Sequence, residues 1–209
     1  MMGRTHMMLG ALTGALLESQ APGLGVLEGI LIGAIGGLVP DLDHPNSKAT
    51  RSIAPIALGG SRRNSMVLMS LGVMALAWQG HLPYDGVMAI ACWLLVAALS
   101  KHRGITHSLI GLLSATYAVH TWLGASWIIF AVGYASHLFA DMLTDRGVPL
   151  LWPLQLDFSI PTGFSTGRFW STFVEKWIQM GCILYIGWIL VPHLEQLLRL
   201  AEAQLLTTF

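Results

Sequence analysis

The sequence has little charge: only 11% of its 209 residues are Asp, Glu, Lys or Arg, whereas an ordinary soluble domain carries about 25%. Basic and acidic residues balance at 11 each, so the chain lacks the positive excess that attracts nucleic acid. We therefore expect no nucleic-acid partner. With 54% of its residues hydrophobic, the chain instead has a composition typical of a protein that lies mostly in a lipid bilayer.

Cysteine is scarce as well. The two cysteines, Cys92 and Cys182, lie in apolar segments, and we interpret each as a small buried hydrophobic residue. A disulfide framework and a cysteine-based zinc site are therefore not expected. The N-terminus has no recognisable signal-peptide cleavage site, so we expect it to be retained.

The sequence is rich in long apolar segments. A helix that crosses a membrane needs about 20 residues, and several segments approach this length. Seven segments qualify as candidate helices: 6–20, 24–40, 64–80, 86–100, 105–123, 125–142 and 177–198. Short breaks rich in Gly and Pro favour antiparallel helical pairs. We predict an all-α fold, a polytopic membrane bundle of about six to seven helices in a single transmembrane domain, residues 1–209.

Basic residues divide unequally between the connections. If successive segments cross the membrane alternately, every Lys and Arg except Arg199 falls on one side. Positive charge accumulates on the cytoplasmic side of membrane proteins. The N-terminus and the long polar stretches 41–63 and 143–176 are therefore expected to face the cytoplasm. Their length indicates functional loops rather than simple connections.

Four polar motifs gather on this same side. They are RTHMMLG (4–10), PDLDHP (40–45), HRGITHS (102–108) and HLFADMLTD (137–145). His137 and Asp141 are spaced one helical turn apart, so they share a helix face and can bind one ion. In the two TH pairs, we expect Thr5 and Thr106 to cap the helix that follows.

The first and third motifs also repeat the pattern TH-x-x-x-G. His6 precedes Asp41 by 35 residues, and His107 precedes Asp141 by 34. This similarity indicates two related helical hairpins, each of which brings a histidine beside an aspartate. Such a pair of hairpins would form a metal site with pseudo-twofold symmetry.

Imidazole and carboxylate groups together suit zinc, manganese or iron better than magnesium or calcium, which prefer oxygen ligands alone. The absence of cysteine argues against a closed structural zinc site, and ionisable groups buried in membranes are usually functional. The candidate ligands are His6, Asp41, Asp43, His44, His107, His137 and Asp141. Because they number more than four, either two ions bind or some of these residues orient the others.

Four segments in combination, THMMLGAL, GGLVPDLDHPNS, HRGITHSL and GYASHLFADMLTDRGVPLLWP, resemble the YdjM-like family of inner-membrane proteins, described as metal-dependent hydrolases. The resemblance covers residues 1–50 and 101–155 and leaves the hairpin 64–100 as an insertion. It implies a multi-pass protein of the bacterial cytoplasmic membrane with a bound divalent metal. Carried over residue by residue, it implies the ligand set His6, Asp41, Asp43, His44, His102, His107, His137 and Asp141.

For this site we expect one or two divalent ions, with zinc preferred over manganese or iron, that activate water at the cytoplasmic membrane face. Asp43 or Asp145 is the candidate general base, and Arg103 is expected to face the negative charge that develops on the substrate. A lipid-linked ester or phosphoester fits a site in this position, because its tail can stay in the bilayer.

Two other classes of protein stay open at this point. One is a metal or proton transporter, although the segments that would line a path across the membrane carry almost no ionisable residues. The other is a non-catalytic membrane protein whose metal only holds helices together. A homo-oligomer is compatible with the small-residue segment 29–38, which permits close helix packing within or between chains.

Overall fold

The computed structural model describes residues 3–17, 24–54, 56, 61–82, 84–154, 156–163, 165 and 168–207. This part of the chain is helical and contains no β-strand beyond an isolated bridge between Val148 and Phe158. The all-α prediction is confirmed. The helices are α1 (Gly3–Leu17), α2 (Val26–Leu38), η2 (Val39–Asp43), α3 (Lys48–Ile53), α4 (Arg62–Trp78), α5 (Tyr84–Leu99), η4 (Ile105–His107), α6 (Leu109–Leu123), η5 (Gly124–Ser126), α7 (Trp127–Met142) and α8 (Phe169–Thr207), where η marks a 3-10 helix.

Each of the seven predicted apolar segments overlaps one long helix, and two connections differ from the prediction. The last helix, α8, begins at Phe169 rather than at 177, so the polar loop before it is shorter than predicted. The stretch 41–63 is not entirely loop, because it contains α3, whose N-cap Ser47 accepts a hydrogen bond from the Thr50 amide at 3.1 Å. Residues 18–20 of the first predicted segment lie outside the described residues.

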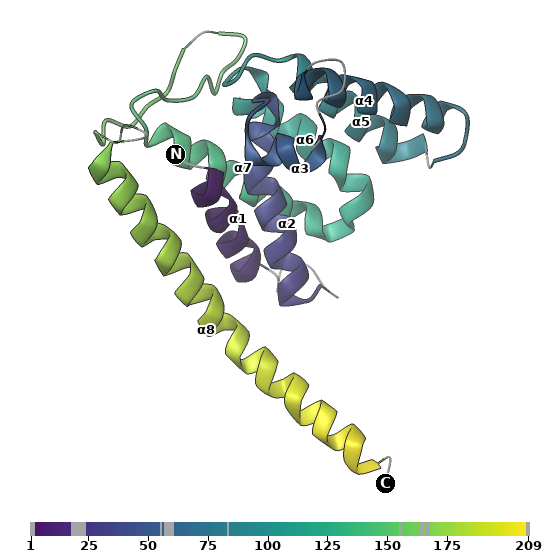
Figure 1. Ribbon diagram of the computed structural model, residues 1–209, viewed down its shortest axis with the longest axis vertical. Helices are drawn as coiled ribbons and strands as arrows, with labels where there is room; N and C mark the ends of the chain where they lie inside the picture. Colours follow the sequence, from purple (N-terminus) through teal and green to yellow (C-terminus); the bar gives the residue numbers. More distant parts are fainter. Residues whose placement is uncertain are drawn as a thin grey trace.

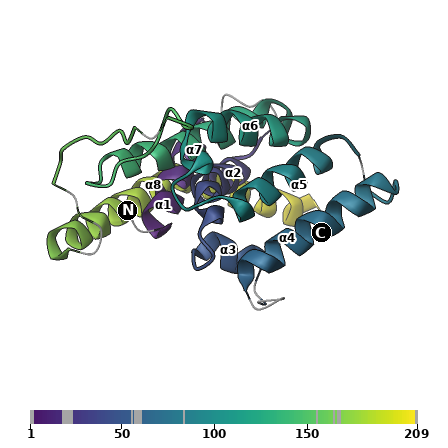
Figure 2. The same ribbon diagram turned by 90° about the horizontal axis from the view of Figure 1, so that it is seen from above.

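Helices α1, α2 and α7 form the centre of the bundle (Figures 1 and 2). Glycines allow their backbones to touch. A Cβ atom added to Gly33 of α2 would lie 2.1 Å from the carbonyl oxygen of Gly10 and 2.9 Å from the Cα atom of Gly14, both on α1. A Cβ atom on Gly133 of α7 would lie 2.4 Å from the carbonyl oxygen of Gly33. This small-residue packing brings the polar faces of α1 and α7 together.

The two predicted threonine caps are not formed. Thr106 lies in η4, where its hydroxyl donates a hydrogen bond to Asp43 at 2.6 Å. The N-cap of α6 is Ser108 instead, whose side chain accepts a backbone N–H of the helix. Thr5 lies within α1 and donates to Glu175 of α8 at 2.9 Å. The capping prediction is wrong because each hydroxyl reaches a carboxylate, which is a stronger acceptor than neutral groups are.

Helices α4 and α5 lie side by side at one edge of the bundle in both views (Figures 1 and 2). Helix α8 contacts α1 and then runs away from the other helices (Figure 1). Of the described helices, only α8 is long and apolar enough to cross a membrane by itself, over Phe169–Gln196. The other long helices have 13 to 17 residues, about 20–26 Å at 1.5 Å per residue. A multi-pass bundle therefore stays a prediction.

The outward faces of the helices are strongly apolar. Leu31, Leu113 and Trp188 are each more than 60% exposed, and many other large apolar side chains are exposed with them. A water-soluble monomer rarely presents so much contiguous apolar surface. These faces suit contact with lipid.

Candidate metal centre

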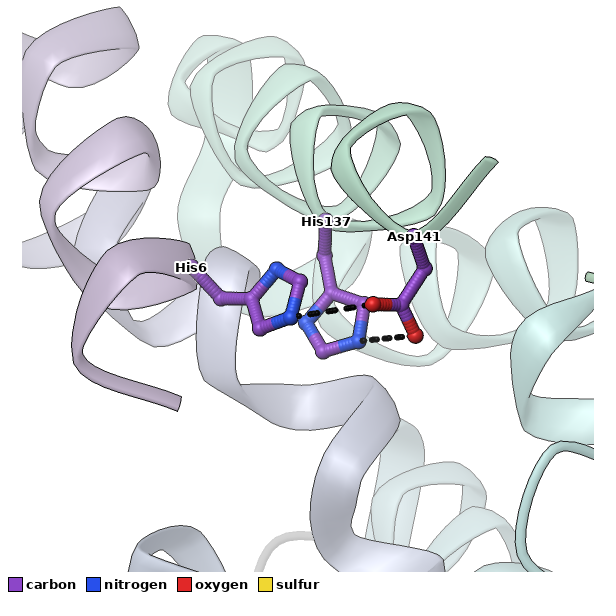
Figure 3. A group of neighbouring side chains, drawn as sticks. All are labelled: His6, His137 and Asp141. Atoms are coloured by element: carbon purple, nitrogen blue, oxygen red, sulfur yellow. Dashed lines mark ion pairs between the residues drawn. The ribbon is translucent and has the colours of Figure 1, made fainter. Parts of the chain in front are cut away.

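The central group consists of His6 of α1 with His137 and Asp141 of α7 (Figure 3). None of these three residues is more than 2% exposed. The two imidazole rings stack with their centroids 3.7 Å apart, and His6 Nε2 lies 3.2 Å from Asp141 Oδ1. His137 and Asp141 share a helix face, as their spacing predicts. The glycine contacts between α1, α2 and α7 place His6 beside them.

The orientation of His137 is set by α2. Its Nδ1 donates a hydrogen bond to the carbonyl oxygen of Gly37 at 2.8 Å, so the proton of the neutral ring is on Nδ1. The other nitrogen, Nε2, faces three further groups: it lies 3.3 Å from His107 Nε2, 3.8 Å from Asp41 Oδ1 and 3.9 Å from Asp141 Oδ2. Four donor atoms from distant parts of the sequence therefore converge.

His107 is oriented in the same way from its other side. Its Nδ1 lies 3.3 Å from Asp43 Oδ2 and 3.1 Å from the hydroxyl of Thr106. The Thr106 hydroxyl donates its own proton to Asp43, so both neighbours of this nitrogen act as acceptors. The proton of His107 is thus on Nδ1, and Nε2 presents a lone pair to His137. Two nitrogen lone pairs that face each other at 3.3 Å repel one another, and a cation bound by both nitrogens would remove this repulsion.

Asp43 organises the segment that carries His102 and His107. Its carboxylate accepts hydrogen bonds from His102 Nδ1 at 2.9 Å, from the Arg103 amide at 3.0 Å and from Thr106. Burial raises the pKa of Asp43, but the bonds from His102, His107 and Thr106 outweigh it and hold this pKa well below its ordinary value. Burial likewise lowers the pKa of His102, and the bond to Asp43 outweighs it, so the net shift is upward.

Arg103 contacts the centre through Asp141. Its guanidinium pairs with Asp141 Oδ2 at 2.9 Å and donates to the carbonyl oxygen of Gly147 at 2.7 Å. Its backbone adopts a φ of 60°, a left-handed conformation that is rare outside glycine. Such strain persists where surrounding contacts enforce it, and it is common at functional sites.

Three groups of donor atoms within the described residues are close enough to hold an ion, with every pair of atoms in a group within 4.8 Å. The groups overlap, because His137 belongs to two of them and His107 to two. Their members are His6, His137 and Asp141; Asp41, His107 and His137; and Asp43, His102 and His107. Of the ten residues predicted from the sequence, these groups include seven. Arg103 contacts two of the seven, Asp43 through its backbone amide and Asp141 through its guanidinium.

Two predicted residues lie apart from these groups. His44 contacts the His102 ring edge-on, with centroids 4.8 Å apart, and its Nδ1 accepts the Asn46 amide at 3.2 Å. Asp145 is exposed and accepts a hydrogen bond from the Ser165 hydroxyl. Asp145 is therefore poorly placed to act as a base in the buried centre.

Sequence reasoning missed the supporting residues. Glu175 of α8 is only 2% exposed and accepts the Thr5 hydroxyl, beside His6, while Gln179 donates to the same hydroxyl at 2.8 Å. Tyr134 of α7 is fully buried and donates to the carbonyl oxygen of Thr106. A signal for Glu175 was present, since it is an acidic residue in an otherwise apolar helix and lies just before the segment that begins at 177.

Comparisons with known proteins place the chain in a family of membrane proteins. The profile of a family described as YdjM inner membrane protein matches residues 1–196. The inner membrane protein YdjM of Escherichia coli and that of Shigella flexneri are each 40% identical over 105 residues, which are 47% of this chain and 51% of each relative. The chain thus spans about half the length of these two relatives.

A third relative is matched over more of its length. The Bacillus subtilis protein named uncharacterized protein YvsG is 24% identical over 187 residues, which are 88% of this chain and 94% of the relative. No solved structure matches the chain. The names of the two YdjM relatives support an inner-membrane location.

Proposed function

The chain belongs to the YdjM family of inner membrane proteins, and from this membership and the buried centre we propose that it is a divalent-metal-dependent hydrolase. The observation that carries the proposal is the pair of imidazole nitrogens, His107 Nε2 and His137 Nε2, that face each other at 3.3 Å beside two carboxylates. Neutral imidazole with carboxylate is the donor set of zinc and of the neighbouring transition metals.

A single ion fits this donor set better than two do. His137 has only Nε2 to offer, because its Nδ1 is bonded to Gly37, so the two groups that contain His137 share one nitrogen. We assign the ion to His6, His107, His137 and Asp141. Asp43 then acts on His107 through Nδ1, in the carboxylate–histidine arrangement that fixes the orientation of metal-binding imidazoles.

The remaining residues have distinct roles. A divalent ion held by these residues would supply Lewis acidity and would lower the pKa of a water molecule bound to it. Asp43 is engaged by three donors, whereas Asp41 is partly exposed at the open side of the centre, with 18% of its side chain accessible. We therefore assign proton transfer to Asp41. Arg103 neutralises one oxygen of Asp141 and holds that carboxylate in place.

The substrate that suits this site is a lipid-linked ester or phosphoester at the cytoplasmic membrane face. An inner-membrane location and exposed apolar helix faces allow a lipid tail to remain in the bilayer while its head group reaches the centre. The basic residues beside the centre support a cytoplasmic position.

The test is metal analysis and hydrolysis with the purified full-length protein in detergent. We expect about one transition-metal ion per chain and metal-dependent hydrolysis of p-nitrophenyl acetate or bis(p-nitrophenyl) phosphate. His137→Ala and Asp41→Asn should abolish hydrolysis, and the matched control His120→Ala, an exposed histidine outside the three groups, should not.

Other outcomes distinguish the alternatives. Protein without a stoichiometric transition metal would overturn the proposal. A tightly bound metal without hydrolysis of either ester would favour a structural ion that joins α1 to α7. Uptake of metal by proteoliposomes, lost in His137→Ala, would favour a transporter.

A further inference from the structure

A polar pocket of about 500 Å³ adjoins the metal centre. It lies between the start of α1, the segment 41–47 and the first turns of α8, and its lining includes Arg4, Asp41, Asn46, Thr172, Lys176 and Gln179. Asp41 is the residue of the three ligand groups that lines this pocket. Through Asp41, the pocket borders the metal centre.

The charges of the pocket favour an anion. Arg4 of α1 and Lys176 of α8 are both exposed, and each contributes a positive charge to its wall. The one acidic side chain in the lining is Asp41, at the border with the metal centre, where a bound cation would offset its charge. Asn46, Thr172 and Gln179 add amide and hydroxyl groups, which can donate hydrogen bonds to an oxyanion.

Three other cavities among the described residues have a different character. They are lined by apolar side chains such as Ile90, Leu94, Val119 and Phe130, between α2, α4, α5, α6 and α7. None of them has a charged residue in its lining. Among these cavities, only the pocket beside Asp41 can compensate a negative charge.

We propose that this pocket binds the phosphate group of the substrate, with Arg4 and Lys176 as its counter-charges and Asp41 at its border with the metal centre. The assignment rests on the proposed function and narrows it from esters in general to phosphate-bearing esters. Two basic side chains in the lining of one pocket, from α1 and α8, can both contact one phosphate, whose oxygens accept charge-assisted hydrogen bonds. A volume of about 500 Å³ leaves room for a small head group beside the phosphate.

The test measures phosphate binding separately from catalysis. Calorimetric titration of inorganic phosphate into the zinc-loaded full-length protein is compared for the wild type, the double variant R4Q/K176Q and the control R199Q. Arg199 is exposed on the same helix as Lys176, about 35 Å farther along it at 1.5 Å per residue. We expect R4Q/K176Q to bind phosphate at least about tenfold more weakly and R199Q to bind it as the wild type does.

Catalysis supplies a second measurement. In R4Q/K176Q, the KM for bis(p-nitrophenyl) phosphate should rise about tenfold, while R199Q should keep the KM of the wild type and the metal content should be the same in all three proteins. Phosphate binding that is undetectable in the wild type, or equal in R4Q/K176Q and R199Q, would overturn the phosphate pocket but leave the hydrolase proposal intact. Conversely, phosphate binding that depends on Arg4 and Lys176 without hydrolysis of either ester would overturn the hydrolase and keep the pocket.

Competition identifies the source of the phosphate. Phosphatidic acid in phosphatidylcholine–detergent mixed micelles and soluble glycerol 3-phosphate are each tested for displacement of inorganic phosphate. Preferential displacement by phosphatidic acid would support a lipid phosphoester, and preferential displacement by glycerol 3-phosphate would support a soluble one. Displacement by neither would contradict the pocket's assignment.

Discussion

Replacement of Gly33 by alanine tests whether backbone contact between α1 and α2 builds the metal centre. The new Cβ atom would lie 2.1 Å from the carbonyl oxygen of Gly10, whereas ordinary van der Waals contact begins at 3.4 Å. The obstructing atoms belong to the backbone, so no side chain can rotate away. The two helices must therefore separate by about 1.3 Å, the difference between these distances.

This separation has a cost that can be estimated. Overpacking of a close-packed interior costs about 1–3 kcal/mol, while alanine in place of a helical glycine recovers about 1 kcal/mol of backbone entropy. Gly72 of α4 is the matched control, because its added Cβ atom would meet nothing within 4 Å. Because this entropy gain is common to both variants, Gly33→Ala should be less stable than Gly72→Ala by about the overpacking cost, about 1–3 kcal/mol.

The effect should reach the metal centre as well. Helix α2 carries the Gly37 carbonyl that orients His137, and α1 carries His6. A displacement of one helix against the other should weaken metal binding by about 10–100-fold, as loss of an orienting contact does. The assays are thermal unfolding in detergent and competitive metal titration. Equal melting temperatures for Gly33→Ala and Gly72→Ala would refute the reasoning.

Three further predictions follow from the centre. Asp141→Asn should weaken metal binding in a chelator-competition assay by more than about 100-fold, whereas Asp145→Asn, on an exposed side chain, should leave it unchanged; similar losses in both would contradict the assigned ligand set. Tyr134→Phe should lower the free energy of unfolding by about 1–2 kcal/mol, because it removes a buried hydrogen bond to the Thr106 carbonyl, and Tyr117→Phe, 75% exposed, should not. Removal of the metal by chelation should lower the melting temperature, since an ion at 100 times its Kd contributes about 2.7 kcal/mol; a melting temperature insensitive to chelator would argue against a buried ion.

The helices and the gathering of the polar motifs could be predicted from the sequence. The apolar segments predicted the positions of the long helices, because a helix that packs in a bundle or against lipid needs apolar side chains. This requirement does not depend on which particular partner the helix contacts. The His137–Asp141 pair follows from helical periodicity alone. His6 and Asp41 could be placed near it because ionisable groups at the end of an apolar helix need compensation.

The division of roles could not be predicted. Asp41 and Asp43 are two residues apart in one motif, yet their environments differ. Asp41 lines a pocket, whereas Asp43 is buried and accepts hydrogen bonds from three groups. That difference arises from η2, whose side-chain directions depend on how the 102–107 segment packs on it. Thr5 and Thr106 were assigned as caps because local sequence does not show a carboxylate that arrives from a distant helix. Asp145 resembles a site residue in sequence but turns toward Ser165.

The centre draws its ligands from both ends of a long stretch of chain, and this determines when it can be completed during synthesis. Asp141 follows His6 by 135 residues, which a ribosome adds in about 7–27 s. During that interval the first hairpin is already made, but His6 lacks its carboxylate. Under the proposed function, a metal would therefore be bound only after α7, which carries Asp141, has been synthesised. Glu175, which fixes Thr5 beside His6, emerges later still.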